Sequence, residues 1–123
     1  MDKLKFINEQ LEAIGIPYEF GEWTSAVRYP YFVGEITENE PFTEDGLEES
    51  TLILTGFHRG KYIDLEEVKE RIKSHFHPIN GLIGQTDNGA IVVFFVGCFY
   101  LPTGEAELKK IQINLKIKEW KVN

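Results

Sequence analysis

The sequence predicts a single α+β domain over residues 1–123, in which a mostly antiparallel sheet has two α-helices packed on one face. Three observations predict this fold class. Two segments carry apolar residues at helical spacing, and the segments between and after them are rich in the β-branched and aromatic residues that favour strands. The chain has 123 residues, 42% of them hydrophobic, which is enough apolar material for one core.

The first helix is predicted at the N-terminus, where Asp2 can cap its start and Gly15 can end it. Pro17 bars any continuation of the helix, so the chain should turn into a short extended segment at residues 16–23. The helix presents apolar residues at intervals of three and four along one face: Leu4, Ile7, Leu11 and Ile14.

A hairpin with a long charged tip is predicted next. Residues 28–38 favour a strand, because a proline near the start drives the preceding residue toward extended geometry and aromatic and β-branched residues follow. Residues 50–57 form the second strand of this hairpin. The acidic stretch between the two strands contains Pro41, Asp45 and Gly46, which suit a turn or an extended loop.

The second helix is predicted from Asp64 to His77, ahead of Pro78. Asp64 stands three residues before Glu67, a spacing in which the first carboxylate can cap the start of a helix. Helical spacing then continues through the apolar residues Leu65, Val68, Ile72 and Phe76.

The longest apolar run, residues 90–101, is predicted to be the central strand of the sheet and to be entered by a tight turn at residues 87–89. The last strand should have one buried and one wet face, because its residues alternate between apolar and polar. Its apolar phase shifts by one position near the end, which predicts a bulge or a strand end near Lys118 and Glu119. The alternating apolar residues are Ile111, Ile113, Leu115 and Ile117.

Residues 90–101 are apolar at successive positions, so both faces of this strand should be covered. Two short helices can cover only one side of a sheet. We therefore expect a neighbouring subunit to cover the other side.

The charge and hydropathy of the chain exclude several classes of partner. A formal net charge of -7 repels phosphate backbones, so no nucleic acid partner is expected. No apolar run reaches the roughly 18 residues that cross a bilayer, and the N-terminus indicates an amphipathic helix instead of a signal peptide. We expect a cytosolic protein without membrane contact. Cys98 has no partner cysteine and lies in an apolar run, where a buried thiol behaves as a small hydrophobe.

We expect no enzyme activity, no cofactor and no metal centre. The sequence has no glycine-rich phosphate loop, no nucleophile elbow and no cysteine pair at metal-binding spacing. His75 and His77 flank Phe76, and His58 can supply a third metal ligand from the sheet, but polar residues at a helix end explain the pair better. The alternative function is a small ligand-binding or enzymatic domain that uses His58, His75 and nearby carboxylates.

Opposite charges on two separate elements predict a contact between subunits. The acidic arm around the first hairpin tip is either a solvated loop or the partner of the basic outer face of the last strand in another copy. Phe42 in this arm is the aromatic residue most expected to be exposed, whereas most other aromatic residues of residues 18–31 are expected in the core. The predicted interface residues are Glu38, Glu40, Phe42, Glu44, Asp45, Glu48, Glu49, Lys110, Lys116 and Lys118.

Several local strings, taken in this order, carry a family resemblance. These are IPYEFGEWTSAVRYPYFVGEITE, then TLILTGFHRG opening into DLEEVKERIKSHF, then TDNGAIVVFF. From Leu4 to about Trp120 the chain resembles small structural proteins from the tail and neck of long-tailed bacteriophages and prophages, most of all tail terminator and tail-to-head joining proteins. The resemblance rests on element order and strand character and transfers no catalytic residue.

The resemblance implies a ring, commonly a hexamer, that caps the end of the tail tube and stops its polymerisation. The implied partners are other copies of the chain, the tail tube protein and the head-connector protein. The implied location is the host cytoplasm during assembly and then the tail or neck of the virion. Another neck or tail-completion role is the runner-up, because one fold serves several positions in such particles.

Overall fold

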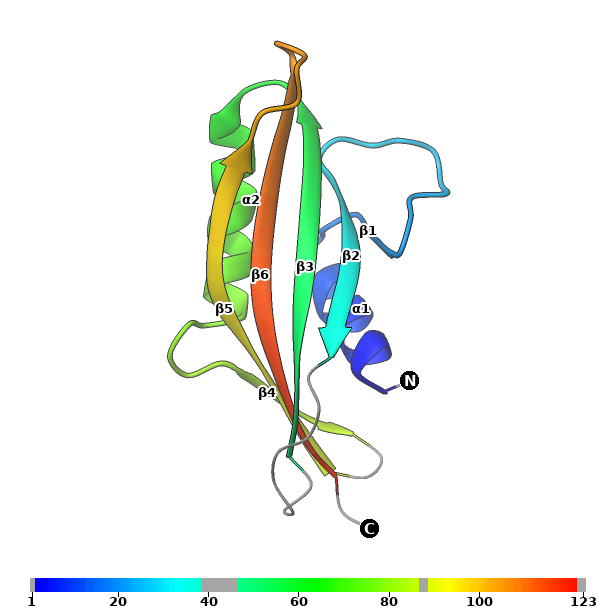
Figure 1. Cartoon of the computed structure of the whole chain (residues 1–123), viewed down its shortest axis with the longest axis vertical. Coiled ribbons are helices and arrows are strands. Elements are labelled where there is room, and N and C mark those ends of the chain that lie inside the picture. Colours follow the sequence, from blue (N-terminus) through cyan, green and yellow to red (C-terminus); the bar gives the residue numbers. More distant parts are fainter. Residues whose placement is uncertain (1, 39–46, 87–88, 122–123) are drawn as a thin grey trace.

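The computed structural model describes residues 2–38, 47–86 and 89–121. Six strands form one sheet with the order β1-β2-β3-β6-β5-β4, in which β1 and β2 are parallel and all other neighbours are antiparallel (Figure 1). The elements are α1 (Asp2–Ala13), β1 (Tyr18–Phe20), β2 (Tyr31–Glu38), β3 (Leu47–Arg59), α2 (Tyr62–His75), β4 (Leu82–Thr86), β5 (Gly89–Leu101) and β6 (Leu108–Lys121).

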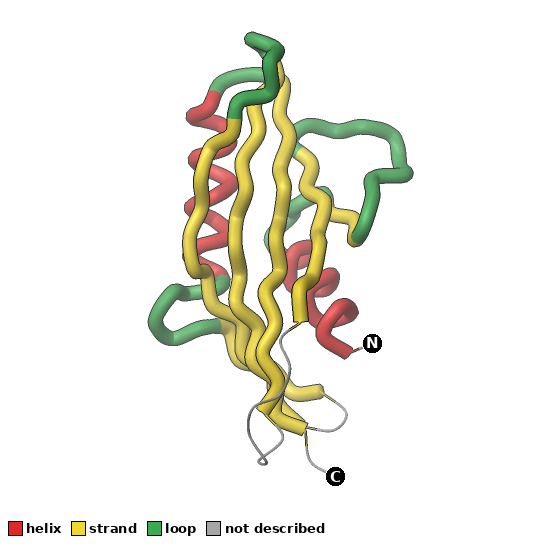
Figure 2. Tube along the Cα trace, in the orientation of Figure 1, coloured by secondary structure: helices red, strands yellow, loops and turns green. Residues whose placement is uncertain are grey.

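The predicted fold class, a mostly antiparallel sheet with two α-helices packed on one face, is wrong. Strands make up about half of the chain, the sheet is mixed, and it curls instead of offering a flat face for a helical layer. Both short helices lie behind the strands in Figures 1 and 2, inside the curl. α1 contacts β1 and β4, the two opposite ends of the strand order, and α2 contacts β6. The sheet therefore wraps around the helices.

A glycine on the inside of the curl lets α1 pack closely against β4. The inner face is the one that carries Leu52, Leu54, Ile113 and Leu115, and the outer face is the opposite one. Gly84 of β4 also lies on the inner side, where a Cβ atom would overlap the ring of Phe6 from α1. Because the glycine has no side chain, the helix can approach the edge strand closely.

The first helix follows its prediction. α1 ends at Ala13, and Gly15 adopts the left-handed conformation with φ 73°. The N–H of Gly15 bonds to the carbonyl of Glu12 and the N–H of Ile16 bonds to that of Leu11, which satisfies the last carbonyls of the helix. Its apolar face joins one buried cluster: Ile7, Leu11, Ile16, Phe32, Leu52, Leu54, Leu65, Val68, Ile72, Phe76, Ile91, Val93, Phe95, Ile111, Ile113, Leu115 and Ile117.

The second helix begins earlier than predicted. α2 starts at Tyr62 with Lys61 as its N-cap, and Asp64 occupies the third helical position, where its carboxylate accepts a hydrogen bond from the Lys61 N–H at 3.4 Å. Asp64 thus caps the helix from within its first turn. None of the described helices is both long and apolar enough to cross a bilayer.

The strand order also corrects the prediction. β3 and β6 occupy the centre of the sheet, whereas β5, the predicted central strand, is second from the end. β4 was not predicted at all, since Gly84 and Gln85 interrupt its apolar character. The first hairpin, β2 with β3, and the last one, β5 with β6, are confirmed. The tip of the first hairpin, residues 39–46, lies outside the described residues.

No bulge or strand end occurs near Lys118 and Glu119. β6 stays paired with β3 and β5 through this region, and the bulge lies in β5 instead, at Val96. The apolar phase changes because Glu119 takes the next inner position, where its carboxylate is buried 3.7 Å from the ammonium of Lys3. Trp120 consequently falls on the outer face.

Candidate assembly surface

The open edge of β5 carries exposed apolar and aromatic side chains. β4 pairs with β5 only over residues 89–93, so residues 96–101 have β6 on one side and no strand from the described chain on the other. Val96 is 62% exposed, Phe99 46% and Tyr100 39%. An open strand edge with apolar side chains is a template for pairing with another polypeptide.

A pocket of about 610 Å³ borders this edge where α2 begins and β5 ends; Tyr62, Ile63, Glu66 and Tyr100 line it. The rings of Tyr62 and Tyr100 are nearly perpendicular, with centroids 5.3 Å apart. The hydroxyl of Tyr100 donates a hydrogen bond to the Glu66 carboxylate. The pocket therefore combines two aromatic rings with one carboxylate.

The charge of Glu66 is fixed by its neighbours. Hydrogen bonds from Lys69 and then from Tyr100 hold the pKa of the Glu66 carboxyl below its usual value. Burial, with the hydrogen bond to Glu66 as a second cause, raises the pKa of Tyr100 to about 12. At neutral pH the pocket thus presents a neutral phenol beside a carboxylate that is already paired with the ammonium of Lys69 at 2.6 Å. A carboxylate oxygen accepts more than one hydrogen bond, so a further donor or cation can join this pair.

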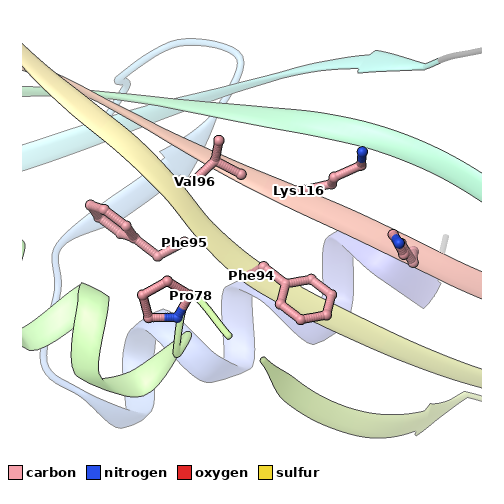
Figure 3. Close-up of a pocket in the computed structure, with 6 residues that line it drawn as sticks. Pro78, Phe94, Phe95, Val96 and Lys116 are labelled. Atoms are coloured by element: carbon pink, nitrogen blue, oxygen red, sulfur yellow. The ribbon is translucent and has the colours of Figure 1, made fainter. Parts of the chain in front are cut away.

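A second pocket, of about 390 Å³, lies beside the bulge of β5 (Figure 3). Phe94 is on the outer face of the sheet, with the ammonium of Lys118 5.9 Å from its ring centroid. The lining residues are Pro78, Phe94, Phe95, Val96, Lys116 and Lys118. The open edge is therefore bordered by one pocket that carries a carboxylate and one that carries two ammonium groups.

An aromatic cluster covers the outer face of the sheet near the opposite end of the strand order, over β2 and β3. The ring centroid of Trp23, from the β1–β2 loop, lies 4.8 Å from that of Tyr31. Tyr31 in turn stacks on Phe57, with 5.2 Å between the ring centroids. The indole Nε1 of Trp23 is buried without a hydrogen-bond partner in the described part of the chain. These rings pack on one another outside the core, so the prediction that most aromatic residues of this region enter the core is wrong for them.

The predicted interface residues fall into separate places. Glu49 of β3 lies across from β6, 3.3 Å from the ammonium of Lys116 and 3.9 Å from that of Lys118. The charges proposed to meet between subunits therefore partly meet within one chain. Glu38 accepts a hydrogen bond from Lys3 at 2.6 Å, and Glu48 is the second residue of β3. Glu40, Phe42, Glu44 and Asp45 lie outside the described residues.

Lys110 does not join this group. It lies across from Phe57 at the far end of β6, with its ammonium 5.7 Å from the ring centroid of Phe57. It stands six positions before Lys116 on an extended strand, a distance of roughly 20 Å at the rise of a β-strand. The basic face of β6 is therefore two separate sites.

The histidines of the alternative function do not share a site. His58 lies 2.9 Å from the Asp64 carboxylate beside the start of α2, and this hydrogen bond lowers the pKa of Asp64. His75 lies 2.8 Å from the Gln10 side-chain oxygen at the other end of that helix. Within the described ranges, no group of three or more histidine, cysteine or acidic side chains is arranged to hold a metal ion. Cys98 is half-buried against the core, and burial raises the pKa of its thiol.

Sequence patterns did not reveal the pocket residues Tyr62, Ile63 and Tyr100. A usable signal was present, because Tyr62 and Ile63 are consecutive and cannot both face the core from one helix. Comparison of the chain with models of known protein families found no match, and comparison with curated protein sequences also found none.

Proposed function

We propose that this protein is an assembly component of the tail of a long-tailed phage or prophage, which closes into a ring on the end of the tail tube. The observation that carries the proposal is the open edge of β5, where Val96, Phe99 and Tyr100 are exposed on a strand edge that no other described strand pairs with. Soluble proteins rarely leave such an edge uncovered, because it pairs with other chains. A ring of identical subunits covers it. The family resemblance of the sequence supports the same role.

Two different surfaces favour a ring over a two-fold dimer. The edge of β5 and the aromatic cluster around Tyr31 lie on opposite sides of the sheet, next to β4 and next to β1. If one surface meets the other on the next copy, the contact is heterologous, and successive copies close into a ring when the rotation between them closes. A closed ring has a fixed size.

The mechanism is docking without chemistry. A monomer binds the finished end of the tube, further copies close the ring, and the ring blocks addition of tube subunits while offering a new surface to the head connector. A neck or tail-completion role uses the same steps at an adjacent position. The ligand-binding alternative loses its main support, because His58 and His75 have different partners at opposite ends of α2.

Sedimentation velocity over a wide concentration range, together with a thermal-shift screen of divalent metals and metabolites, tests the proposal. The expected result is one closed oligomer whose population increases with protein concentration, and no ligand in the screen should stabilise the fold. A strict monomer stabilised by a small molecule or metal would favour the alternative function.

A further inference from the structure

The β1–β2 loop, residues 21–30, offers a free cationic segment. Val27 is 53% exposed and Tyr29 41%, and Arg28 between them is exposed with no hydrogen-bond or ion-pair partner within the described chain. Residues 26–28 belong to no helix, strand or turn, and their backbone makes no hydrogen bond to the described chain. The loop projects from the molecule beside β2, on the side away from β5 (Figure 1). Residues 26–28 can therefore pair with another strand without breaking a backbone hydrogen bond within the described chain, and the neighbouring Tyr29 accepts a side-chain hydrogen bond from Arg59 at 3.3 Å.

The open edge of β5 has backbone groups placed to receive such a segment. The N–H of Phe95 points away from β6, because it bonds to the carbonyl of Phe76 at 2.8 Å. Phe95, Cys98 and Tyr100 are opposite residues 115, 113 and 111 of β6, which alternate along that strand. Residue pairs in an antiparallel ladder alternate between hydrogen-bonded and non-hydrogen-bonded pairs, so all three of these are non-hydrogen-bonded pairs. The N–H and C=O of Cys98 and Tyr100 therefore also point away from β6, to the open side.

The pocket beside this edge suits an arginine. A strand added to β5 lies about 4.8 Å from it, and its side chains alternate between the two faces. Cys98 and Tyr100 face inward, so every second side chain of the added strand enters the space between β5 and the start of α2. Glu66, Tyr62 and Tyr100 line that space and offer a guanidinium one carboxylate and two aromatic rings.

We infer that residues 26–29 of one copy add as a strand to the open edge of β5 in the next copy, with Arg28 in the pocket of Tyr62, Ile63, Glu66 and Tyr100. This inference rests on the proposed ring and names its contact. Loop 21–30 and the pocket lie on opposite sides of the sheet but toward the same end of the molecule, the upper end in Figure 1. That placement is the one a rotation about a ring axis requires.

The two halves of the contact supply different properties. Main-chain hydrogen bonds along the edge give affinity, and the pocket gives specificity for the side chain that enters it. Because Arg28 and Glu66 lose water together, reversing either charge should weaken association at least about tenfold. Exchanging both charges should restore much of it.

Sedimentation velocity of single and double charge variants tests the inference. Arg28→Glu and Glu66→Arg should each lose the oligomer at concentrations where the unmodified chain forms it, and the double variant should regain it. The two single variants mixed together should also regain the oligomer, because alternating copies make two kinds of contact. The intact loop of one variant meets the intact pocket of the other, and the two substituted partners carry opposite charges, as they do in the double variant. Lys5→Glu, a charge reversal of the same size on the exposed side of α1, should assemble normally.

A second pair of variants controls for folding and for surface apolarity. Ile63 is 62% exposed in the pocket, and Ile79 is 81% exposed beyond the other end of α2. Ile63→Lys should weaken assembly at least about tenfold, whereas Ile79→Lys should leave it unchanged. Equal effects of these two variants would overturn the inference, as would normal assembly of Arg28→Glu.

Failure of the ring and failure of the contact give different results. If the chain oligomerises and Arg28→Glu does not matter, the ring stands and the contact is wrong. If the chain stays monomeric, a fluorescently labelled peptide of residues 21–30 tests the contact alone. The chain is titrated into the peptide, and binding is followed by fluorescence anisotropy. The peptide should bind the unmodified chain and bind the Ile63→Lys variant at least about tenfold more weakly. Absence of binding, or equal binding to both, would overturn the inference.

Discussion

The ammonium of Lys3 lies 3.7 Å from the carboxylate of Glu119, and both side chains are more than nine-tenths buried. The pair joins the first turn of α1 to β6, one of the two central strands, inside the curl of the sheet. Lys3 also donates a hydrogen bond to Glu38, whose side chain is 58% exposed. The two ion pairs therefore tie the start of α1 to β6 and to the end of β2.

Lys3→Met should lower the free energy of unfolding by about 3 kcal/mol, because it leaves the carboxylate of Glu119 buried without its partner. Denaturant unfolding of the single and double variants measures this. Lys3→Met combined with Glu119→Leu should cost clearly less than the sum of the two single changes. Glu38→Gln, at the exposed contact, should cost no more than about 1 kcal/mol. Strict additivity of the buried pair would contradict this role.

Gly84→Ala should destabilise the fold by about 1–3 kcal/mol, because the new methyl group overlaps the Phe6 ring and forces α1 away from β4. Gly97→Ala is the matched control, since no atom beyond its neighbours lies within 4 Å of the added Cβ position. Thermal or denaturant unfolding of both variants checks the difference. Equal stability of the two would show that the helix does not depend on this close approach.

Tyr18→Phe should make the protein less sensitive to alkaline pH. Burial raises the pKa of Tyr18 to about 12, and its hydroxyl is buried with no hydrogen-bond partner among the described residues. A raised pKa means that the folded state holds the proton more tightly than the unfolded state. The stability that the neutral, buried phenol contributes is therefore fully present below about pH 10, and it is lost as pH rises from about 10 to 12. Urea unfolding at several pH values in this range should show a smaller loss for Tyr18→Phe than for the unmodified chain.

Reversing Lys116 and Lys118 to glutamate tests the predicted contact between acidic and basic surfaces. Both ammonium groups lie near Glu49 of the same chain, so the reversal also disturbs β3 and β6 locally. Adding Glu49→Lys restores opposite charges within the chain. If the contact between subunits is real, assembly and its salt dependence should remain impaired in this triple variant. Recovery of normal assembly would show that these charges matter only within one subunit.

The elements set by local sequence were predictable, and those set by distant contacts were not. α1 follows from helical spacing and from Gly15, which ends it. β4 has only five residues and gains its strand geometry from pairing with β5. The parallel contact of β1 with β2 and the curl depend on close approaches such as Phe6 to Gly84, which spacing along the chain does not encode.

The candidate site shows the same division. Charge clusters at Glu49, Lys116 and Lys118 were visible in the sequence, but their pairing within one chain follows from the register of β3 against β6. The open edge of β5 was hidden because its apolar run suggested a fully paired central strand. Tyr62 and Tyr100 are 38 positions apart in the sequence and meet only because α2 lies behind the end of β5.

Electron microscopy of particles assembled without this protein tests the central claim most directly. Under the proposed function, deletion of the gene should give tail tubes of uncontrolled length if the ring ends polymerisation, or finished tails detached from heads if it joins the two. A copy supplied in trans should restore normal particles. Intact particles with tails of uniform length and attached heads, made in its absence, would contradict the account.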